Sequence, residues 1–212
     1  YQMQREVYAS TMTGKLEGFR AINSNTRSNP FCLKMHESAR ADVICRSCYS
    51  HEMLKAYRAN TVPALQRNTD VLSKPWNPDD VIKLAGKGRK RFQPGEYVRI
   101  SGHGEIVNAE DVVNVMRIIR ENPQARFSWW TKRHQLIRQY CEANGKPENL
   151  ILVYSNPIVD KVMTKPPAWF DKAFNNISKP HENENCTGQK CRDCMACYDP
   201  KSSTNVIIER VK

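Results

Sequence analysis

The sequence predicts an α/β fold with a mostly parallel sheet, arranged either as a partial barrel or as an open sheet. Between residues 97 and 154, three short apolar segments alternate with two segments of helical periodicity. The first helical segment carries signals for its first and last residues, and the second carries a signal for its end. This alternation is typical of parallel strands joined by right-handed helical crossovers. Irregular, cysteine-rich segments are expected on both sides of this core.

The elements of the core follow from local signals. Asn108 is a good N-cap for the first helix, whose apolar residues recur on one face up to Asn122-Pro123. Gly145 is a typical terminator for the second helix. In chain order, the sequence predicts a strand at 97–100, a helix at 108–122, a strand at 125–130, a helix at 132–144 and a strand at 149–154.

Two more helical regions are expected before this core. The pattern from His51 to Ser73 is helical and is interrupted at Pro63. Asn77 followed by Pro78 has the character of an N-cap and a first helical residue, so a further helix is expected to begin there.

The chain divides into three parts by composition. Residues 1–50 are rich in Asn, Ser, Thr and Arg and are expected to form an irregular N-terminal segment that bears cysteines. Residues 51–180 form the predicted α/β core. Residues 181–212 are expected to form a cysteine-rich, metal-binding C-terminal segment.

Composition limits the class of protein and its partners. Hydrophobic residues make up 40% of the 212 residues, which is enough for one core and excludes a disordered chain. No apolar run approaches the roughly 18 residues of a membrane helix, and the N-terminal residues lack the apolar stretch of a signal peptide. The formal net charge of +11 favours a polyanionic partner such as nucleic acid, although bound thiolates would offset part of this charge.

The densest motif lies near the C-terminus. Cys186-x4-Cys191-x2-Cys194-x2-Cys197 places four thiols within twelve residues. Disulfides between cysteines three residues apart would be strained, so metal binding in a reducing cytoplasm is favoured. Structural zinc more often uses two separated C-x2-C pairs, whereas C-x2-C-x2-C brings several sulfurs around one iron–sulfur cluster. The motif therefore favours a 4Fe-4S cluster, with zinc as the alternative.

A second cysteine group lies near the N-terminus. Cys32-x12-Cys45-x2-Cys48 offers three thiolates. These cysteines either form their own centre, completed by an open position, His36 or a ligand, or share one metal with the C-terminal group. Cys141 lies late in a predicted helix with no cysteine neighbour and is expected to be a packed thiol.

Polar residues follow each of the three predicted core strands. In parallel α/β folds, the loops after the carboxyl ends of strands carry the functional groups. Glycines in the first loop would allow close approach of a ligand. The three loops read Ser101-Gly102-His103-Gly104-Glu105, Thr131-Lys132-Arg133-His134 and Ser155-Asn156-Pro157.

Taken together, these motifs resemble the phage "gene product 88" family. The order is the same: early cysteines ending in C-x2-C-Y, strands closing on S-G, W-T and S, and a cysteine-rich end. The resemblance implies a phage or prophage origin and a host-cytoplasm setting, and little about activity. It is carried by Asn29-Pro30-Phe31-Cys32, Cys45-Arg46-Ser47-Cys48-Tyr49, Ser101 to Glu105, Trp130-Thr131-Lys132-Arg133, Tyr154-Ser155-Asn156 and the terminal cysteines.

A more distant similarity is to the radical S-adenosylmethionine enzymes. Their early three-cysteine loop and the Gly-Gly-Glu-type segment after their second strand match Cys45-x2-Cys48-Tyr49 and the segment from Ser101 to Glu105 in order. Their usual spacing is C-x3-C-x2-C, whereas the first gap here is twelve residues. The similarity implies S-adenosylmethionine as a further candidate cofactor, and the spacing argues against its cleavage.

We therefore expect a cytoplasmic iron–sulfur protein that holds a small polar or anionic ligand at the ends of its strands, and that acts as a redox or radical enzyme of unknown reaction. In this hypothesis His103 and Glu105 transfer protons. The alternative is a zinc-stabilised, basic nucleic-acid-binding module without catalysis, and a third hypothesis is a structural cluster in a phage interaction protein. The expected ligand-binding residues are Ser101, Gly102, Gly104, Lys132, Arg133, Ser155 and Asn156, and the expected metal ligands are Cys32, Cys45, Cys48, Cys186, Cys191, Cys194 and Cys197.

Overall fold

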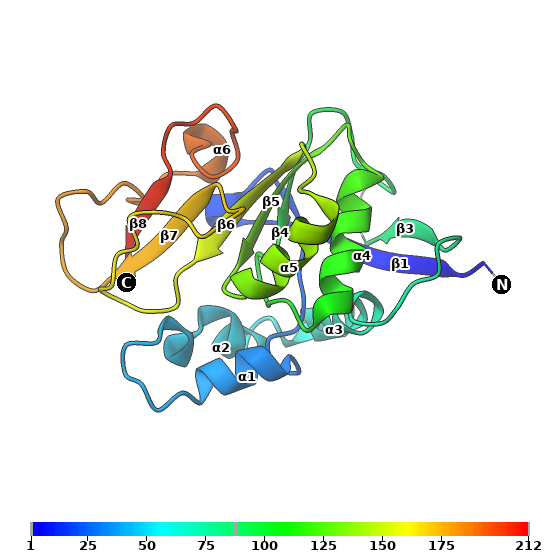
Figure 1. The fold of residues 1–212 in the computed structure, drawn as a ribbon. Helices are drawn as coiled ribbons and strands as arrows, with labels where there is room; N and C mark the ends of the chain where they lie inside the picture. The colour runs from blue at the N-terminus through cyan, green and yellow to red at the C-terminus, as the bar shows by residue number, and fades with distance from the viewer. Residues whose placement is uncertain (1, 87–88, 212) are drawn as a thin grey trace.

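The computed structural model, which describes residues 2–86 and 89–211, contains one open sheet of eight strands (Figure 1). The strand order is β3-β1-β2-β4-β5-β6-β7-β8, and every neighbouring pair is parallel except β1 and β2. The strands are β1 (Gln4–Thr11), β2 (Arg20–Ile22), β3 (Val81–Ala85), β4 (Tyr97–Ile100), β5 (Arg126–Thr131), β6 (Leu150–Ser155), β7 (Lys172–Ile177) and β8 (Val206–Arg210). The α-helices are α1 (Pro30–His36), α2 (Tyr49–Lys55), α3 (Val62–Leu72), α4 (Ala109–Arg120), α5 (His134–Asn144) and α6 (Cys191–Cys194).

The predicted core is confirmed, and its sheet is open and does not close into a barrel. The five expected elements correspond to β4, α4, β5, α5 and β6. The Asn108 side chain accepts a hydrogen bond from the Asp111 amide at 3.0 Å, as expected of an N-cap. Gly145 follows α5 with a φ of 71°, a conformation that favours glycine.

The helix expected at Asn77-Pro78 is wrong. This segment is a turn that leads into β3. The Asp80 carboxylate accepts hydrogen bonds from the amides of Asn77 and Met3 and pairs with Arg5 at 2.7 Å. These contacts tie the segment to β1, so a tertiary strand pairing overrides the local helix signal.

Residues 1–50 carry more regular structure than expected. They supply β1 and β2, which extend the sheet beyond β4, and the short helix α1. Figure 1 shows α1 and α2 together at one end of the molecule, away from α6 and the C-terminal segment.

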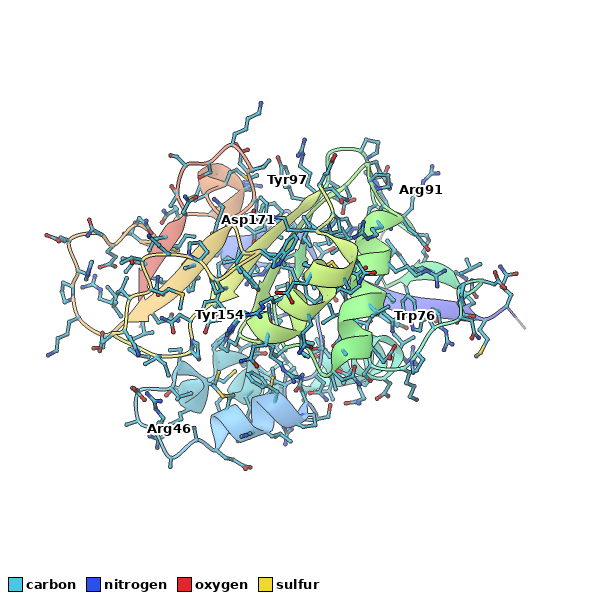
Figure 2. The ribbon with its side chains drawn as sticks, in the orientation of Figure 1. Arg46, Trp76, Arg91, Tyr97, Tyr154 and Asp171 are labelled. Atoms are coloured by element: carbon cyan, nitrogen blue, oxygen red, sulfur yellow. The ribbon has the colours of Figure 1, made fainter. Side chains whose placement is uncertain are left out.

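The two faces of the sheet bury different layers. On one face, Val98, Phe127, Trp129 and Leu152 pack with residues of α4 and α5 in the main core. Figure 2 shows the side chains between sheet and helices, including Tyr154, whose ring meets the His134 ring of α5 edge-on at 5.1 Å.

The opposite face carries a smaller apolar cluster, made by Ile151, Val153, Phe174 and Ile207. Trp130, Cys186 and Cys197 pack against this cluster. The C-terminal segment therefore covers the sheet face that the helices leave free. Among the described residues, no helix combines the length and the apolar character needed to cross a membrane.

Candidate metal and ligand site

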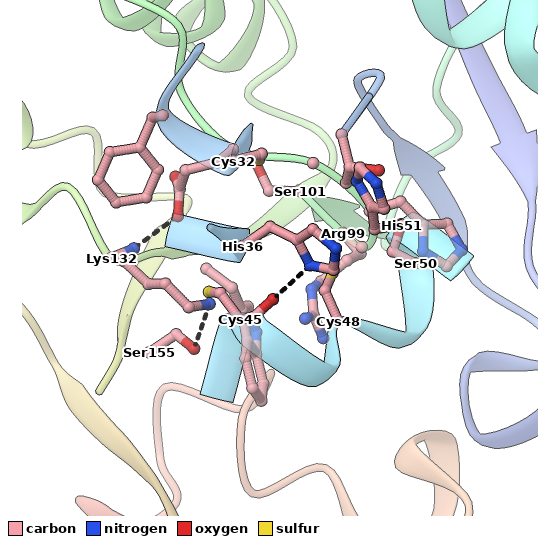
Figure 3. Close-up of a pocket in the computed structure, with 17 residues that line it drawn as sticks. Cys32, His36, Cys45, Cys48, Ser50, His51, Arg99, Ser101, Lys132 and Ser155 are labelled. Atoms are coloured by element: carbon pink, nitrogen blue, oxygen red, sulfur yellow. Dashed lines mark hydrogen bonds between the residues drawn. The ribbon is translucent and has the colours of Figure 1, made fainter. Parts of the chain in front are cut away.

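A cavity of about 180 Å³ opens where the carboxyl ends of β4, β5 and β6 meet the α1–α2 region (Figure 3). The three predicted polar loops contribute Ser101 to Glu105, Lys132 and Ser155 to its wall. The three N-terminal cysteines line the same cavity. The structure thus brings together two groups of residues that the sequence marked separately.

Cys32 is positioned by the cap of α1. The Asn29 side-chain oxygen accepts hydrogen bonds from the amides of Phe31 and Cys32, and Pro30 occupies the first turn, where no amide donor is needed. The Asn29 side-chain nitrogen donates to the Glu105 carbonyl at 2.7 Å. The Asn-Pro-Phe-Cys motif therefore fixes the first cysteine against the loop that follows β4.

Backbone contacts with the loop after β6 hold the segment that carries Cys45 and Cys48. Cys45 lies in a 3-10 turn, Ile44–Ser47, and Cys48 is the N-cap residue of α2. The Ile44 amide donates to the Pro157 carbonyl at 2.9 Å, and Val43 forms a β-bridge with Ile158. The C-x2-C segment is therefore anchored on the polar end of the sheet by backbone hydrogen bonds.

Lys132 places a positive charge beside these sulfurs. Its ammonium donates to the Ser155 hydroxyl at 3.2 Å, and Figure 3 shows its side chain reaching toward Cys45. Burial alone would lower the pKa of Lys132, but the three cysteines in their thiolate form, together with Glu105, outweigh it and raise the pKa above the usual value. Lys132 is therefore suited to stabilise thiolates or another anion in the cavity.

Even beside this cation, the pKa values of two of the three thiols are raised. Burial raises the pKa of Cys32 far above its ordinary value, with smaller contributions from the charges of Glu105, Cys48 and Cys45. Burial also raises the pKa of Cys45, although Lys132 opposes the shift. Binding of a metal would have to displace these protons, so affinity would increase with pH.

Neither cysteine group has the spacing of a single-ion site in this structure. Among the residues that the structure describes, one group of three or more ligand atoms lies within 4.8 Å of one another, and it consists of His36, His51 and Glu52. Zinc with Zn–S bonds of about 2.3 Å would need sulfurs about 3.8 Å apart. Sulfurs around a cluster bind different irons and can stand farther apart.

Gly102 and Gly104 have a packing role that the sequence did not predict. A Cβ atom at Gly104 would lie 2.0 Å from Ser24 Oγ, and one at Gly102 would lie 2.8 Å from Asn23 Oδ1. Gly104 also has a φ of 85°. The glycines therefore let the loop after β4 press onto residues 23–24, beyond any role in ligand approach.

Glu105 is buried and its carboxylate is occupied by donors from its own chain. It accepts hydrogen bonds from the Thr131 hydroxyl at 2.5 Å, the Ile106 amide at 2.9 Å and the Lys132 amide at 2.7 Å. These contacts join the loops after β4 and β5. They favour a positioning role for Glu105, and proton transfer by this residue stays a prediction.

His103 lines the cavity with a neutral imidazole. Burial, together with smaller contributions from the charges of Arg99 and Arg58, lowers its pKa to about 4. At neutral pH its ring therefore carries no charge and can accept a hydrogen bond from a bound ligand.

Arg133 and Asn156 turn away from the cavity. The Arg133 guanidinium donates to the carbonyls of Ile106 and Val107. The Asn156 amide donates to the Lys161 carbonyl and to the Asn175 side chain. Neither residue lines the cavity, so their predicted contact with a ligand has no geometric support, while Ser101, Lys132 and Ser155 do line it.

Arg99 and Trp130 were not expected in the site. The Arg99 guanidinium lies 3.7 Å from the centre of the Trp130 ring, and both line the cavity. Arg99 also donates to the Tyr198 hydroxyl at 3.1 Å, next to the C-terminal cysteines. A charged residue within a short apolar strand, Tyr97-Val98-Arg99-Ile100, was the available signal for this role.

The C-terminal cysteines form a separate group on the other sheet face. Cys186 accepts a contact from the Lys15 ammonium at 3.5 Å, and the Cys197 carbonyl accepts a hydrogen bond from the Ser128 hydroxyl at 2.9 Å. Burial raises the pKa of Cys197 to about 12, with Arg99 opposing the shift and the charges of Cys191 and Cys186 adding to it. All eight cysteines of the chain are free thiols. The two groups lie at different ends of the molecule, which argues against one shared metal ion (Figure 1).

Comparison with known proteins identifies the family of this chain and gives no information on its reaction. Searches of the curated proteins and of the solved structures gave no match. The similarity to radical S-adenosylmethionine enzymes therefore gains no support. The model of the family described as "Gene product 88" matches residues 20–205, which include both cysteine groups and all three polar loops. The chain belongs to the phage Gene product 88 family.

Proposed function

We propose that this protein binds an iron–sulfur cluster through Cys32, Cys45 and Cys48 and uses the adjoining cavity to hold a small polar or anionic ligand. The observation that carries the proposal is the convergence of these three cysteines, from two separate segments, on a cavity that Lys132 and His103 also line. Three cysteine ligands would leave one iron of a 4Fe-4S cluster open toward the cavity. The proposed setting is the host cytoplasm, where thiols stay reduced.

Three features support a cluster over a zinc ion. The sulfurs do not lie as close together as ligands of one ion. The buried Lys132 charge offsets the negative charge of a thiolate-bound cluster. The motif at the C-terminus, with four cysteines within twelve residues, can close a second cluster completely. The proposed division is an open cluster at the cavity and a closed cluster on the other face.

The cavity residues support chemistry on an anionic ligand. Lys132 and Arg99 supply positive charge, and His103, which lines the cavity with a neutral imidazole, is proposed to accept a proton. Trp130 supplies an apolar wall. We propose a redox or radical reaction of a small ligand in this cavity, with S-adenosylmethionine as one ligand to be assayed.

Metal analysis tests this function. Purification under anaerobic conditions should give a brown protein with about eight irons and eight sulfides per chain, as two 4Fe-4S clusters require. Cys45→Ala and Cys194→Ala should each lose about half of the iron, because each removes a ligand of a different cluster. Cys141→Ala is the matched control, since Cys141 is buried in the helix-side core and should leave the iron content unchanged. Absence of iron and acid-labile sulfide from the wild-type protein would refute the proposal.

A second candidate function is binding of single-stranded nucleic acid by a zinc-stabilised form. It is favoured by an exposed aromatic pair beside the C-x2-C segment: Tyr49 and Tyr57 are 67% and 64% exposed, and their hydroxyls share a hydrogen bond. Exposed tyrosines can stack on bases, and the net charge of +11 favours phosphates. In this case the protein would be colourless, would contain zinc, and would bind oligonucleotides with an affinity that falls steeply with salt and on Tyr49→Ala.

A further inference from the structure

A group of nitrogen and oxygen ligands lies beside the cysteine site. His36 ends α1, one helical turn after Cys32, and His51 and Glu52 lie in the first turn of α2. One ligand atom from each of the three side chains lies within 4.8 Å of the other two. The distance from His36 Nε2 to Glu52 Oε1 is 3.8 Å, and the two imidazole rings lie 4.1 Å apart between centres. Two helices thus bring three potential metal ligands together.

The hydrogen bond of His36 prepares its other nitrogen for a metal. His36 Nδ1 donates to the Cys45 carbonyl at 3.0 Å (Figure 3). Donation from Nδ1 fixes the tautomer in which Nε2 carries a lone pair. Histidines that bind metals usually donate their second ring nitrogen to a carbonyl or carboxylate in this way.

His51 contains a buried polar atom without a partner. The residue is 6% exposed, and among the described residues its Nδ1 has no hydrogen-bond partner. Burial of an unsatisfied polar atom costs roughly 1–3 kcal/mol, so such an atom calls for an explanation. Its ring is stacked on that of His36, and both rings line the cavity. A bound ion could satisfy it.

Glu52 supplies the negative charge. Its carboxylate is half-exposed and pairs with Lys55 at 3.1 Å across one helical turn. Surface pairs of this kind contribute little to stability, so the carboxylate can change partner at small cost. Glu52 can therefore turn toward the imidazoles when a cation arrives.

We propose that His36, His51 and Glu52 bind one divalent transition-metal ion at the cavity edge, separate from the ions or clusters held by the cysteines. Two imidazoles and one carboxylate suit Zn²⁺, Co²⁺ or Fe²⁺ and leave coordination positions open. Because His36 and His51 line the cavity, an open position would face it. This site does not depend on whether the cysteines hold iron.

Titration with Co²⁺ tests the proposal, because its visible spectrum distinguishes nitrogen and oxygen ligands from thiolates. The protein, purified anaerobically with its native metals, should bind one additional Co²⁺ per chain without the near-ultraviolet charge-transfer bands of cobalt thiolates. His36→Ala and His51→Ala should weaken binding by roughly 100-fold or more, a ligand loss at least as large as the effect of losing an outer-shell partner. Glu52→Gln should weaken it about tenfold and, because its side chain is 58% exposed, should leave the fold intact.

Controls separate this site from the cysteine site. His181→Ala changes an exposed histidine in the C-terminal segment and should not affect cobalt binding. Unchanged affinity in Glu52→Gln and in both histidine variants would refute the site, and so would binding of the additional cobalt through thiolates in protein whose cysteines hold iron. Loss of iron and sulfide from the histidine variants would also refute it, since the histidines would then belong to the cluster. If the wild-type protein contains no iron, the proposed cluster fails, and this site is then decided by whether the cobalt bands of nitrogen and oxygen ligands disappear in the histidine variants.

Discussion

The two cysteine groups of this protein are assembled in different ways. The C-terminal group is local: four cysteines within twelve residues, one of them exposed, lie on a segment that packs against the sheet. The N-terminal group is assembled by tertiary structure, because Cys32 and the Cys45–Cys48 pair are held by hydrogen bonds to two different loops of the sheet edge. A local motif can bind metal on its own, whereas an assembled one also acquires a cavity and charged neighbours. The second arrangement is the one suited to chemistry on a ligand.

The largest effect on stability is expected at Gly104, which lets the loop after β4 pack beside the N-terminal cysteine group. This group and its cavity are called the first site below. Gly104→Ala would place a Cβ 2.0 Å from Ser24 Oγ at a φ of 85°, so the loop after β4 must move. We expect a loss of at least about 3 kcal/mol in the free energy of unfolding, measured by urea denaturation, with loss of iron from the N-terminal group.

Gly188 provides the matched control in the C-terminal group. It also has a positive φ, 108°, but a Cβ there would contact nothing within 4 Å. Gly188→Ala should cost about 1 kcal/mol, from backbone strain alone. Equal losses for the two variants would contradict the view that the first site depends on tertiary packing.

The next effect concerns the charge beside the first site. Lys132→Met removes the ammonium that faces Cys45, Cys48 and Cys32 while keeping an unbranched side chain. We expect the iron content to fall by about half, because the proposed C-terminal cluster would lie on the opposite face of the sheet, where Cys186 and Cys197 pack. Arg192→Met, in the exposed helix α6, is the corresponding control and should retain full iron content. Full iron content in Lys132→Met would show that this charge is dispensable for the cluster.

A smaller effect is expected in the pH dependence of the free energy of unfolding, through the buried residue Asp111. Burial raises the pKa of Asp111 to about 7, opposed by a hydrogen bond from the Val107 amide, while the unfolded chain should titrate near 3.8. Between these values the folded state binds more protons, so the free energy of unfolding should fall as pH rises. From about pH 4.5 to about pH 7.5 we expect a fall of about 3 kcal/mol relative to Asp111→Asn. Parallel pH profiles for the two proteins, measured by urea denaturation, would show that Asp111 does not titrate in this range.

The smallest effect is a difference in thiol reactivity in the metal-free chain. Cys194 is exposed, whereas burial holds the pKa of Cys197 at about 12 and raises that of Cys32 strongly. Because the thiolate is the reactive form, iodoacetamide should modify Cys194 first and Cys32 and Cys197 last. Peptide mass spectrometry over time gives the order. Early labelling of Cys32 would show that the N-terminal group is open without its metal.

Several features of the site could not be read from the sequence because they depend on contacts between distant segments. The helix signal at Asn77-Pro78 was overridden when Asp80 bonded to the Met3 amide and to Arg5 of β1. His51 had the character of an ordinary helix residue until the fold stacked it on His36. Arg99 became a site residue because it lies on Trp130 of the next strand. In each case the partner lies too far along the chain for spacing to reveal it.

The sequence by itself determined the α/β core, the edge of the sheet where polar loops gather, the C-terminal cysteine motif and the family. These features depend on periodicity, caps and short spacings, which act within a few residues. Only the tertiary structure decided that the N-terminal cysteines lie at that edge of the sheet and that they are separate from the C-terminal group. It also decided that Glu105 accepts hydrogen bonds that join the loops after β4 and β5. Those outcomes depend on which distant backbone and side-chain groups satisfy one another's hydrogen bonds and charges when buried, and this is fixed only when the chain is folded.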